Sequence, residues 1–444
     1  MQVGFLSYET GSGRAKNVRN ILLKNLLDVM LAAIVWWAVG YGFAYGKSAK
    51  GIIGTNLFFY EGGSTFDKSV RPWFFSWTFC IAACTIISGC LAERTALSAY
   101  PVATLLISGV VHPLLVHWLW SPHGWMSNIG ECQVLDFAGG MVVHMLGGLF
   151  GLVGAWKCGP RLGRFELAAP GRCGMCQYVP KPMPGHDMAF VTLGTFMLWF
   201  GWFGFNNGSV YMYVSGNTLP GADASMANIA SAEVVQRTSM NTALGGASGG
   251  LTALLVAAIF SGTYDLRMCC NGVLSGLVTV TCMCGFVDPW AAVVCSGIAG
   301  ATYTGMSSLL LRCGIDDPLD SSAVHLGNGM LGTLMLAFVA KPEHVLALTG
   351  SPCGGIFYSS TGWMQLGLQL MGVVLVTVVA GGAAWVMFAV LARKGLLRVD
   401  QVTELAGIDN MDHGGPAYPE FAAGSCLLAG GGQNAASAGR RMLQ

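Results

Sequence analysis

The chain has 444 residues, of which 53% are hydrophobic and only 10% are charged, and its formal net charge is +1. Soluble domains carry about 25% charged residues, so this composition excludes an ordinary soluble protein, and the balanced charge provides no basic field for nucleic acid. Long apolar runs recur along the chain, and runs of about 20 residues are typical of membrane-spanning helices. The sequence therefore predicts a polytopic membrane protein.

The apolar runs predict ten complete spans, at residues 20–45, 72–91, 98–119, 136–157, 188–208, 228–260, 271–284, 289–312, 321–340 and 361–393. Residues 1–9 resemble the last turns of one more helix whose beginning is missing. Because lipid admits only helices or closed barrels, these Gly-rich runs predict an all-α bundle over residues 1–398. The polar residues 399–444 predict a cytoplasmic tail that is disordered after about residue 422.

Most of the Lys and Arg residues lie in alternate connections between the spans. These connections are "GRAKNVRN", "AERTAL", "WKCGPRLGR", "YDLRM", "LLLRCG" and "LARKGLLR". Positive charge collects on the cytoplasmic side of membrane proteins. We therefore expect these connections and the C-terminal tail to be cytoplasmic, and the missing first helix to start outside.

The chain has 15 cysteines, and most of them lie in apolar runs, where they behave as small hydrophobic residues. Cys173 and Cys176 form a CxxC pair in a polar loop and could bind a metal, but no second pair stands nearby. No nucleophile–base pair, phosphate loop or metal cluster is apparent in the sequence. We therefore expect neither an enzyme nor a cofactor.

Two histidines lie inside apolar spans and occupy similar positions in two halves of the chain. His144 follows Gly140 and precedes further glycines at helical spacing, and His325 is followed by Gly329 and Gly332. Glycines on one helix face let a second helix approach closely, so each imidazole is expected to point into a packed seam. A single such histidine fits a hydrogen bond between helices, whereas two matching histidines favour a transport pathway.

The residues around these histidines limit what the pair can bind. A neutral imidazole offers one donor and one acceptor, which suits a small neutral polar molecule or a proton better than a metal ion. Asp136 and Asp320 stand just before the two histidine-bearing spans. Taken alone, both acids fit N-terminal caps of their helices.

Six stretches of the sequence resemble a known family. They are "GRAKNVRNILLKNLLDV", "GCLAERTAL", "DFAGGMVVH", "GWFGFNNGS", "NGVLSGLVTVT" and "DDPLDSSAVHLGNG". In this order they resemble the ammonium transporter (Amt/Mep/Rh) family, especially its plant and algal members, over nearly all of residues 1–420. The resemblance implies an eleven-helix bundle of two pseudo-symmetric five-helix halves, with its first helix truncated here. It also implies a homotrimer in the plasma membrane with one pore per subunit.

The resemblance also implies roles for residues at matching positions. Trp120, Ser209 and Asp136 would surround ammonium in an outer vestibule, and Phe79 and Phe205 would form the gate below it. The residues implied to line the pore are His144, His325, Thr281, Phe75 and Trp202. Without the family, Trp120 fits an interfacial tryptophan and the two phenylalanines fit plain core.

The implied function is capture of the ammonium cation, loss of its proton, and passage of ammonia along the histidines. A bare cation in an apolar pore would cost tens of kcal/mol by idealised Born solvation, and ammonium can give up a proton. The alternatives are a passive ammonia gas channel, as in the Rh branch, and an ammonium sensor. In the tail, Met411 stands where plant relatives carry a phosphorylatable threonine, so that phosphoswitch is not expected here.

Overall fold

The computed structural model describes residues 1–61, 66–168, 177–214 and 224–418, without the side chains of 66–71, 167–168, 177, 214 and 224–231. Within these ranges nine helical segments are long and apolar enough to cross a membrane, and Leu266–Thr281 is a shorter apolar helix. The ten predicted spans are therefore confirmed. The end predicted at residue 208 is wrong, because that helix continues to Val214. The expected disorder after residue 422 and the pair Cys173 and Cys176 lie outside the described residues.

The α-helices in chain order are α1 (Gln2–Ser12), α2 (Val18–Val35), α3 (Tyr41–Tyr45), α4 (Phe66–Leu91), α5 (Ala99–Leu106), α6 (His112–Leu119), α7 (Leu146–Cys158), α8 (Met188–Val214), α9 (Ala224–Ser261), α10 (Leu266–Thr281), α11 (Pro289–Arg312), α12 (Asn328–Val339), α13 (Pro342–Thr349), α14 (Gly362–Arg393), α15 (Gln401–Ala406) and α16 (Ile408–Asp412). A 3₁₀ turn, η1 (Ala15–Asn17), precedes α2, and four π-helical segments are η2 (Trp36–Gly40), η3 (Ile107–Val111), η4 (Gly140–Met145) and η5 (Ser322–Gly327). Two small antiparallel hairpins pair β1 (Ser48–Ala49) with β2 (Ile53–Gly54) and β3 (Phe165–Ala168) with β4 (Gln177–Pro180).

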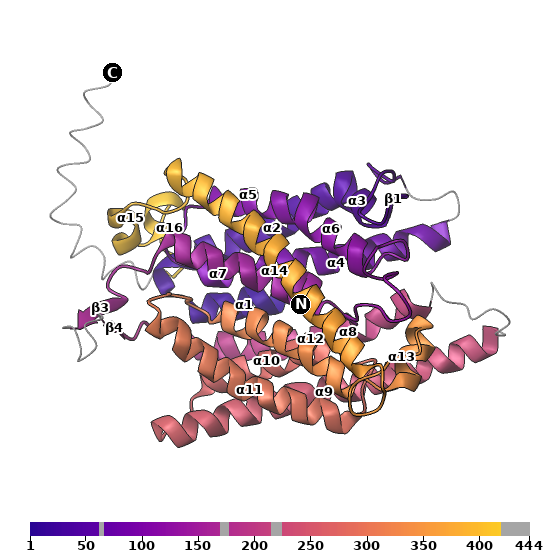
Figure 1. Ribbon diagram of the computed structural model, residues 1–444. Helices are drawn as coiled ribbons and strands as arrows, with labels where there is room; N and C mark the ends of the chain where they lie inside the picture. The colour runs from indigo at the N-terminus through magenta and orange to yellow at the C-terminus, as the bar shows by residue number, and fades with distance from the viewer. Residues whose placement is uncertain (62–65, 169–176, 215–223, 419–444) are drawn as a thin grey trace, which may run out of the picture.

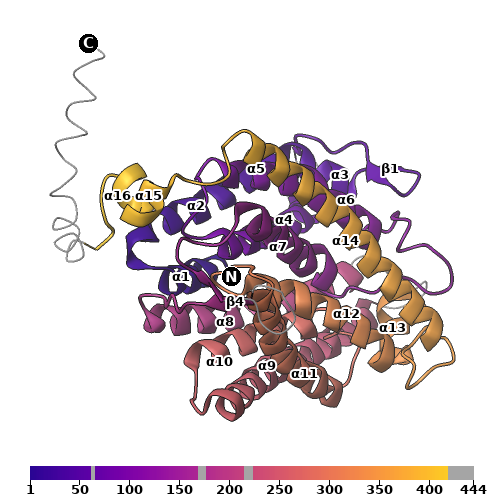
Figure 2. The same ribbon diagram turned by 60° about the vertical axis from the view of Figure 1, so that its left-hand side comes forward.

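The helices of the two halves of the chain lie side by side along one common direction. Figure 1 shows α1 to α7 on one side of the bundle and α8 to α12 on the other, and Figure 2 shows α14 crossing obliquely over the outside. α14 packs against α7 and α12, so it joins the two halves. The hairpin of β3 and β4 lies with α15 and α16 at one end, and α13 and β1 lie at the other (Figure 1).

The histidine-bearing segments run in opposite directions. η4 leads into α7, which ends at Cys158. The carbonyl of the next residue, Gly159, accepts a hydrogen bond from Arg94 Nε–H. η5 begins just after Asp316, whose carbonyl also accepts from Arg94. The end of one histidine-bearing helix therefore lies beside the start of the other. This antiparallel pairing is the arrangement of an inverted repeat.

One end of the bundle is held together by buried ion pairs between basic connections. Glu93 contacts Arg14 at 2.6 Å and Arg161 at 3.1 Å, and Asp316 contacts Arg161 at 2.8 Å. Burial raises the pKa of Asp316, but the Arg161 guanidinium outweighs it and holds that pKa well below its usual range. The basic connections expected to share one side of the membrane do meet at this end.

The described part of the tail docks against the same end of the bundle. Lys16 Nζ donates to the carbonyls of Glu404 and Leu405, both at 2.7 Å. The carboxylate of Asp409 accepts the backbone N–H groups of Arg19 and Asn20, each at 2.9 Å, in the first turn of α2. The tail therefore contributes a cap to a membrane helix.

The opposite end of the bundle carries a disulfide between Cys132 and Cys353, whose Cα atoms are 5.6 Å apart. It joins the connection after α6 to the connection before α14. The Ser351 hydroxyl donates to the carbonyl of Glu131 at 2.7 Å and supports the same junction. The sequence analysis missed this pair, because fifteen cysteines allow too many pairings for any one to stand out.

We expect Asp316→Asn to destabilise the protein strongly, because it removes one of the two carboxylates that pair with the buried Arg161. Breaking a buried ion pair in this way typically costs about 3–5 kcal/mol. Since the pKa of Asp316 is lowered, its contribution is present at neutral pH and is lost only as the pH falls through that lowered value. The measurement is the melting temperature of the purified protein in detergent.

Glu166→Gln is the matched control for this change. Glu166 and Lys181 form an ion pair whose side chains are 62% and 50% exposed, and exposed pairs contribute little. Equal melting temperatures for Asp316→Asn and Glu166→Gln would contradict the role given to the buried network.

Candidate functional site: a vestibule, an aromatic gate and a histidine pair

A cavity of about 240 Å³ opens at the end of the bundle that carries the disulfide. Its walls come from the connection between α6 and η4, from the end of α8 and from α13. Residues that line it include Trp120, Gln133, Asp136, Tyr213 and Leu348. We call this cavity the vestibule.

Trp120 lies on the floor of the vestibule and is fixed by a hydrogen bond. Its Nε1–H donates to the backbone carbonyl of Asp136 at 2.8 Å. Its ring meets the edge of Phe79 with a centroid distance of 5.3 Å and an interplanar angle of 85°. An aromatic face held in this way can stabilise a cation by about 0.5–2 kcal/mol.

Asp136 acts through two different groups. Its carboxylate accepts four backbone N–H groups, from Gly139, Gly140, Met141 and Val142, at 2.6–3.1 Å. The predicted N-terminal cap is therefore confirmed, and the carboxylate has no free oxygen to offer a ligand. Only the backbone carbonyl of Asp136 takes part in the hydrogen bonds of the vestibule.

The phenylalanines predicted to form a gate lie directly below Trp120. The rings of Phe79 and Phe205 stack with centroids 3.9 Å apart and planes 28° apart, and both residues are buried. Phe75 packs against Phe79 at 4.7 Å. A side chain at Gly208 would collide with the ring of Phe75, so this glycine lets the aromatic group lie against α8. The stack closes the path between the vestibule and the interior.

Ser209 lies one helical turn after Phe205 and is fully buried. Its hydroxyl donates to the carbonyl of Phe205 at 3.0 Å. Because a hydroxyl has one hydrogen and two lone pairs, the oxygen of Ser209 remains free only to accept.

His144 and His325 lie side by side behind the gate, as predicted. Their Nδ1 atoms are 3.2 Å apart, the ring centroids are 5.1 Å apart and the planes differ by 8°. His144 Nε2 is buried without a hydrogen-bond partner among the described residues. If both rings are neutral, one Nδ1 donates to the other, so the two imidazoles are opposite tautomers.

The backbone around both histidines is π-helical, which the sequence analysis did not foresee. Helical spacing placed the glycines of the first segment on one face, and this prediction is wrong in part. A side chain at Gly148 would collide with the backbone of Leu326, and one at Gly329 with the carbonyl of Gly140. These glycines do thin the seam between the two segments. In contrast, Gly151 faces Cys90 of α4.

Trp202 and Thr281 support the histidines from α8 and α10. The Trp202 indole stacks on His144 with centroids 5.2 Å apart and planes 13° apart. Its Nε1–H donates to the hydroxyl of Thr281 at 2.7 Å. Thr281 therefore fixes the orientation of the indole, and Trp202 forms a wall of the pathway.

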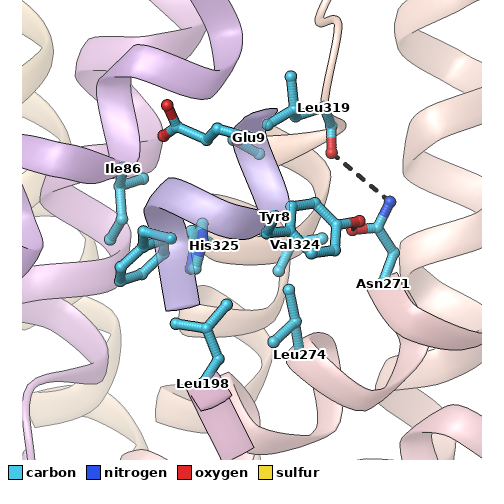
Figure 3. Close-up of a pocket in the computed structure, with 11 residues that line it drawn as sticks. Tyr8, Glu9, Ile86, Leu198, Asn271, Leu274, Leu319, Val324 and His325 are labelled. Atoms are coloured by element: carbon cyan, nitrogen blue, oxygen red, sulfur yellow. Dashed lines mark hydrogen bonds between the residues drawn. The ribbon is translucent and has the colours of Figure 1, made fainter. Parts of the chain in front are cut away.

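Beyond His325 a small enclosed cavity of about 20 Å³ continues the path, which is room for about one water-sized molecule. Figure 3 shows His325 facing this space, with Tyr8, Leu198, Leu274 and Val324 around it. The Tyr8 hydroxyl donates to Asn271 Oδ1 at 2.6 Å. The sequence analysis missed Tyr8 and Asn271, because residues 263 positions apart gave no local signal.

The second helix cap is a different residue from the one predicted. Asp317, and not Asp320, accepts the backbone N–H groups of Ser321 and Ser322, at 3.1 and 2.6 Å. Asp320 has a left-handed backbone with φ of 61° and accepts from the Ser307 hydroxyl at 2.8 Å. Asp317 precedes His325 by eight residues, as Asp136 precedes His144. This equal spacing was the signal that could have identified it.

A helical bundle with an outer vestibule, an aromatic gate and a polar pair inside an apolar interior defines a membrane transport protein. The Ammonium Transporter Family matches residues 1–418. Ammonium transporter 3 of Dictyostelium discoideum is 37% identical over 420 residues, which cover 94% of this chain and 90% of that protein. Ammonium transporter 1 member 2 of Oryza sativa subsp. japonica is also 37% identical, with 92% and 81% covered.

Two solved structures show the same fold. A chain described as a Sensor Amt Protein is 32% identical with a TM-score of 0.78, over 93% of this chain and 94% of that one. Mep2 of Saccharomyces cerevisiae is 26% identical with a TM-score of 0.73, over 90% and 84%. The chain therefore belongs to the ammonium transporter family.

We expect Asp136→Asn to lower the stability of the protein and its uptake activity together. In the wild type, both carboxylate oxygens of Asp136 accept backbone N–H groups. Asparagine replaces one of these oxygens by an NH₂ group, which cannot accept, and each buried N–H donor left without an acceptor costs about 1–3 kcal/mol. Asp317→Asn changes the matching cap at the other end and should lower stability by a similar amount. The melting temperature and the initial uptake rate check both variants. If Asp136→Asn kept full stability and lost only uptake, its carboxylate would act on the substrate instead.

Proposed function

We propose that this protein carries ammonium across a membrane by separating the cation into ammonia and a proton. The cation is captured beside Trp120 and the acceptor oxygen of Ser209. It loses its proton near the gate, and ammonia passes the stack of Phe79 and Phe205. It then forms hydrogen bonds with His144 and His325 in turn. The single observation that carries this proposal is the pair of buried imidazoles in contact, at 3.2 Å, behind a stacked aromatic pair.

The apolar path is what requires the separation. The gate is made of two stacked phenylalanine rings, and apolar side chains line the small cavity beyond His325 together with Tyr8, Glu9, Asn271 and Ser321. Moving an ion from water into such surroundings costs many kcal/mol, whereas ammonia needs only a donor and an acceptor. The paired tautomers supply both. The proton goes either to water in the vestibule, which makes transport electrically neutral, or along the two rings, which makes it electrogenic.

Expression in a yeast strain that lacks its own ammonium permeases tests this function. The wild-type chain should restore growth on low ammonium, and His144→Leu and His325→Leu together should abolish it, because leucine offers no hydrogen bond in the path. His186→Leu is a control, since that ring lies at the basic end, where its Nδ1–H donates to the carbonyl of Gly13. Wild-type growth of the double variant would refute the assigned path.

A current under voltage clamp on adding ammonium separates electrogenic transport from a passive ammonia gas channel. The sensor alternative predicts little flux in the same cells. The homotrimer and the plasma membrane stay predictions that rest on the family resemblance.

We also propose that the basic end faces the cytoplasm and the disulfide end faces outside. Two independent features support this orientation. Basic connections favour the cytoplasmic side, and disulfides persist in oxidising compartments such as the cell exterior. Cys132 and Cys353 lie at one end, whereas the exposed Cys313 follows α11 at the other.

In intact cells, a membrane-impermeant maleimide should label the protein only after treatment with a reductant. That labelling should disappear in the double variant Cys132→Ser and Cys353→Ser. Labelling that depends on Cys313 should appear only after permeabilisation, with Cys313→Ser as its control. Labelling of Cys313 in intact cells would reverse the proposed orientation.

A further inference from the structure

Tyr213 lines the vestibule but has no role in the proposed function. It lies four residues after Ser209 on α8, so the two side chains share one face of the helix. Its ring stacks on Phe137 with centroids 5.0 Å apart and planes 3° apart, and meets the edge of Phe286 at 5.8 Å. Two aromatic neighbours therefore fix the direction in which its hydroxyl points.

The hydroxyl of Tyr213 has already used its hydrogen. It donates to the backbone carbonyl of Asp136 at 3.3 Å. The same carbonyl accepts Trp120 Nε1–H at 2.8 Å. A carbonyl oxygen has two lone pairs, so both positions are taken and the carbonyl offers no free acceptor to a ligand. The Tyr213 oxygen keeps its own lone pairs, and donation to a carbonyl makes it a better acceptor.

Ser209 is in the same state one turn away, because its hydroxyl donates to the carbonyl of Phe205 at 3.0 Å. One face of α8 therefore carries two hydroxyl oxygens that can accept and cannot donate, with Tyr213 lining the vestibule and Ser209 buried one turn deeper, next to the gate. Ammonium has four N–H donors and no lone pair, so it matches such a surface completely. Water has only two O–H donors and also needs to accept, so it fits less well. An alkali cation can be coordinated by the same lone pairs, so these oxygens favour a cation over water.

We propose that Tyr213 is a further ammonium-contacting residue, whose phenol oxygen accepts an N–H of the cation beside Trp120 and Ser209. The proposal rests on the proposed function and extends it, because it names a specificity-determining residue for the same substrate. Capture then uses an aromatic face and two hydroxyl oxygens whose hydrogens are held elsewhere.

The test compares Tyr213→Phe with wild type and with Tyr211→Phe in the full chain reconstituted in proteoliposomes. The first change removes only the oxygen and keeps the stacked ring. The control makes the same change two residues earlier on α8, on a different face of the helix. The measurements are the KM and the maximal rate of ammonium uptake, and the rise in melting temperature that ammonium causes in detergent.

We expect Tyr213→Phe to raise the KM about tenfold with little change in maximal rate, because a hydrogen bond to a charged group contributes about 1.5 kcal/mol or more. The stabilisation by ammonium should shrink in parallel, and Tyr211→Phe should behave as wild type. A KM for Tyr213→Phe that is equal to or below the wild-type value would overturn the proposal. So would equal effects of the two variants.

The failure of the proposed function would look different. In that case the wild-type protein itself would show neither ammonium uptake nor stabilisation by ammonium, and the role of Tyr213 would fall with it. If Tyr213→Phe transported too slowly to measure, the melting-temperature shift would still report binding. A shift equal to that of wild type would then count against the contact.

Discussion

The structure depends on one short contact between two buried side chains, from Nδ1 of His144 to Nδ1 of His325. Two imidazoles can lie 3.2 Å apart only if their backbones come close together. Glycines at the crossing make this possible, because Gly148 lies against the backbone of Leu326 and Gly329 against the carbonyl of Gly140. The π-helical turns of η4 and η5 then bring both rings into the seam. π-Helical turns are rare and are found frequently at functional sites.

Charged groups lie at two places relative to this contact. Glu9 lines the small cavity beyond His325 and contacts Lys24 Nζ at 3.1 Å. The ion pairs of Glu93, Arg161 and Asp316 lie at one end of the bundle, and the vestibule lies at the other. Asp136 lies close to the vestibule, but its charge is satisfied by four backbone N–H groups. Its backbone carbonyl, held by Trp120 and Tyr213, is the group that shapes the vestibule. The carboxylate of Asp136 therefore orders the backbone at the start of η4.

Hydropathy predicted the spans well, because lipid forces every buried backbone group into a helix. The similar glycine patterns around His144 and His325 predicted that the two histidines lie in one packed seam. These patterns could not predict π-helical backbone, since a spacing of 3.6 residues was assumed. They therefore placed all the glycines around His144 on one helix face, although Gly151 faces Cys90 of α4. Asp320 was predicted to cap the second histidine-bearing helix because it lies closest to the start of that helix. Asp317 is the actual cap, and it precedes His325 by the same number of residues as Asp136 precedes His144. Tyr213 and the disulfide were missed because their partners lie far away in sequence.

The described part of the tail is hydrogen-bonded to the start of the membrane helix α2. The first turn of α2 leaves backbone N–H groups without partners in their own helix, and two of them are satisfied by Asp409, about 390 residues later in the chain. The side chain of Asn17 in turn accepts the N–H of Ile408 at 3.0 Å. A boundary drawn at residue 398 by composition therefore cuts through a cooperative unit. Residues near 409 therefore complete a helix that was synthesised about 390 residues earlier, so this end of the bundle cannot finish folding until both segments have been made.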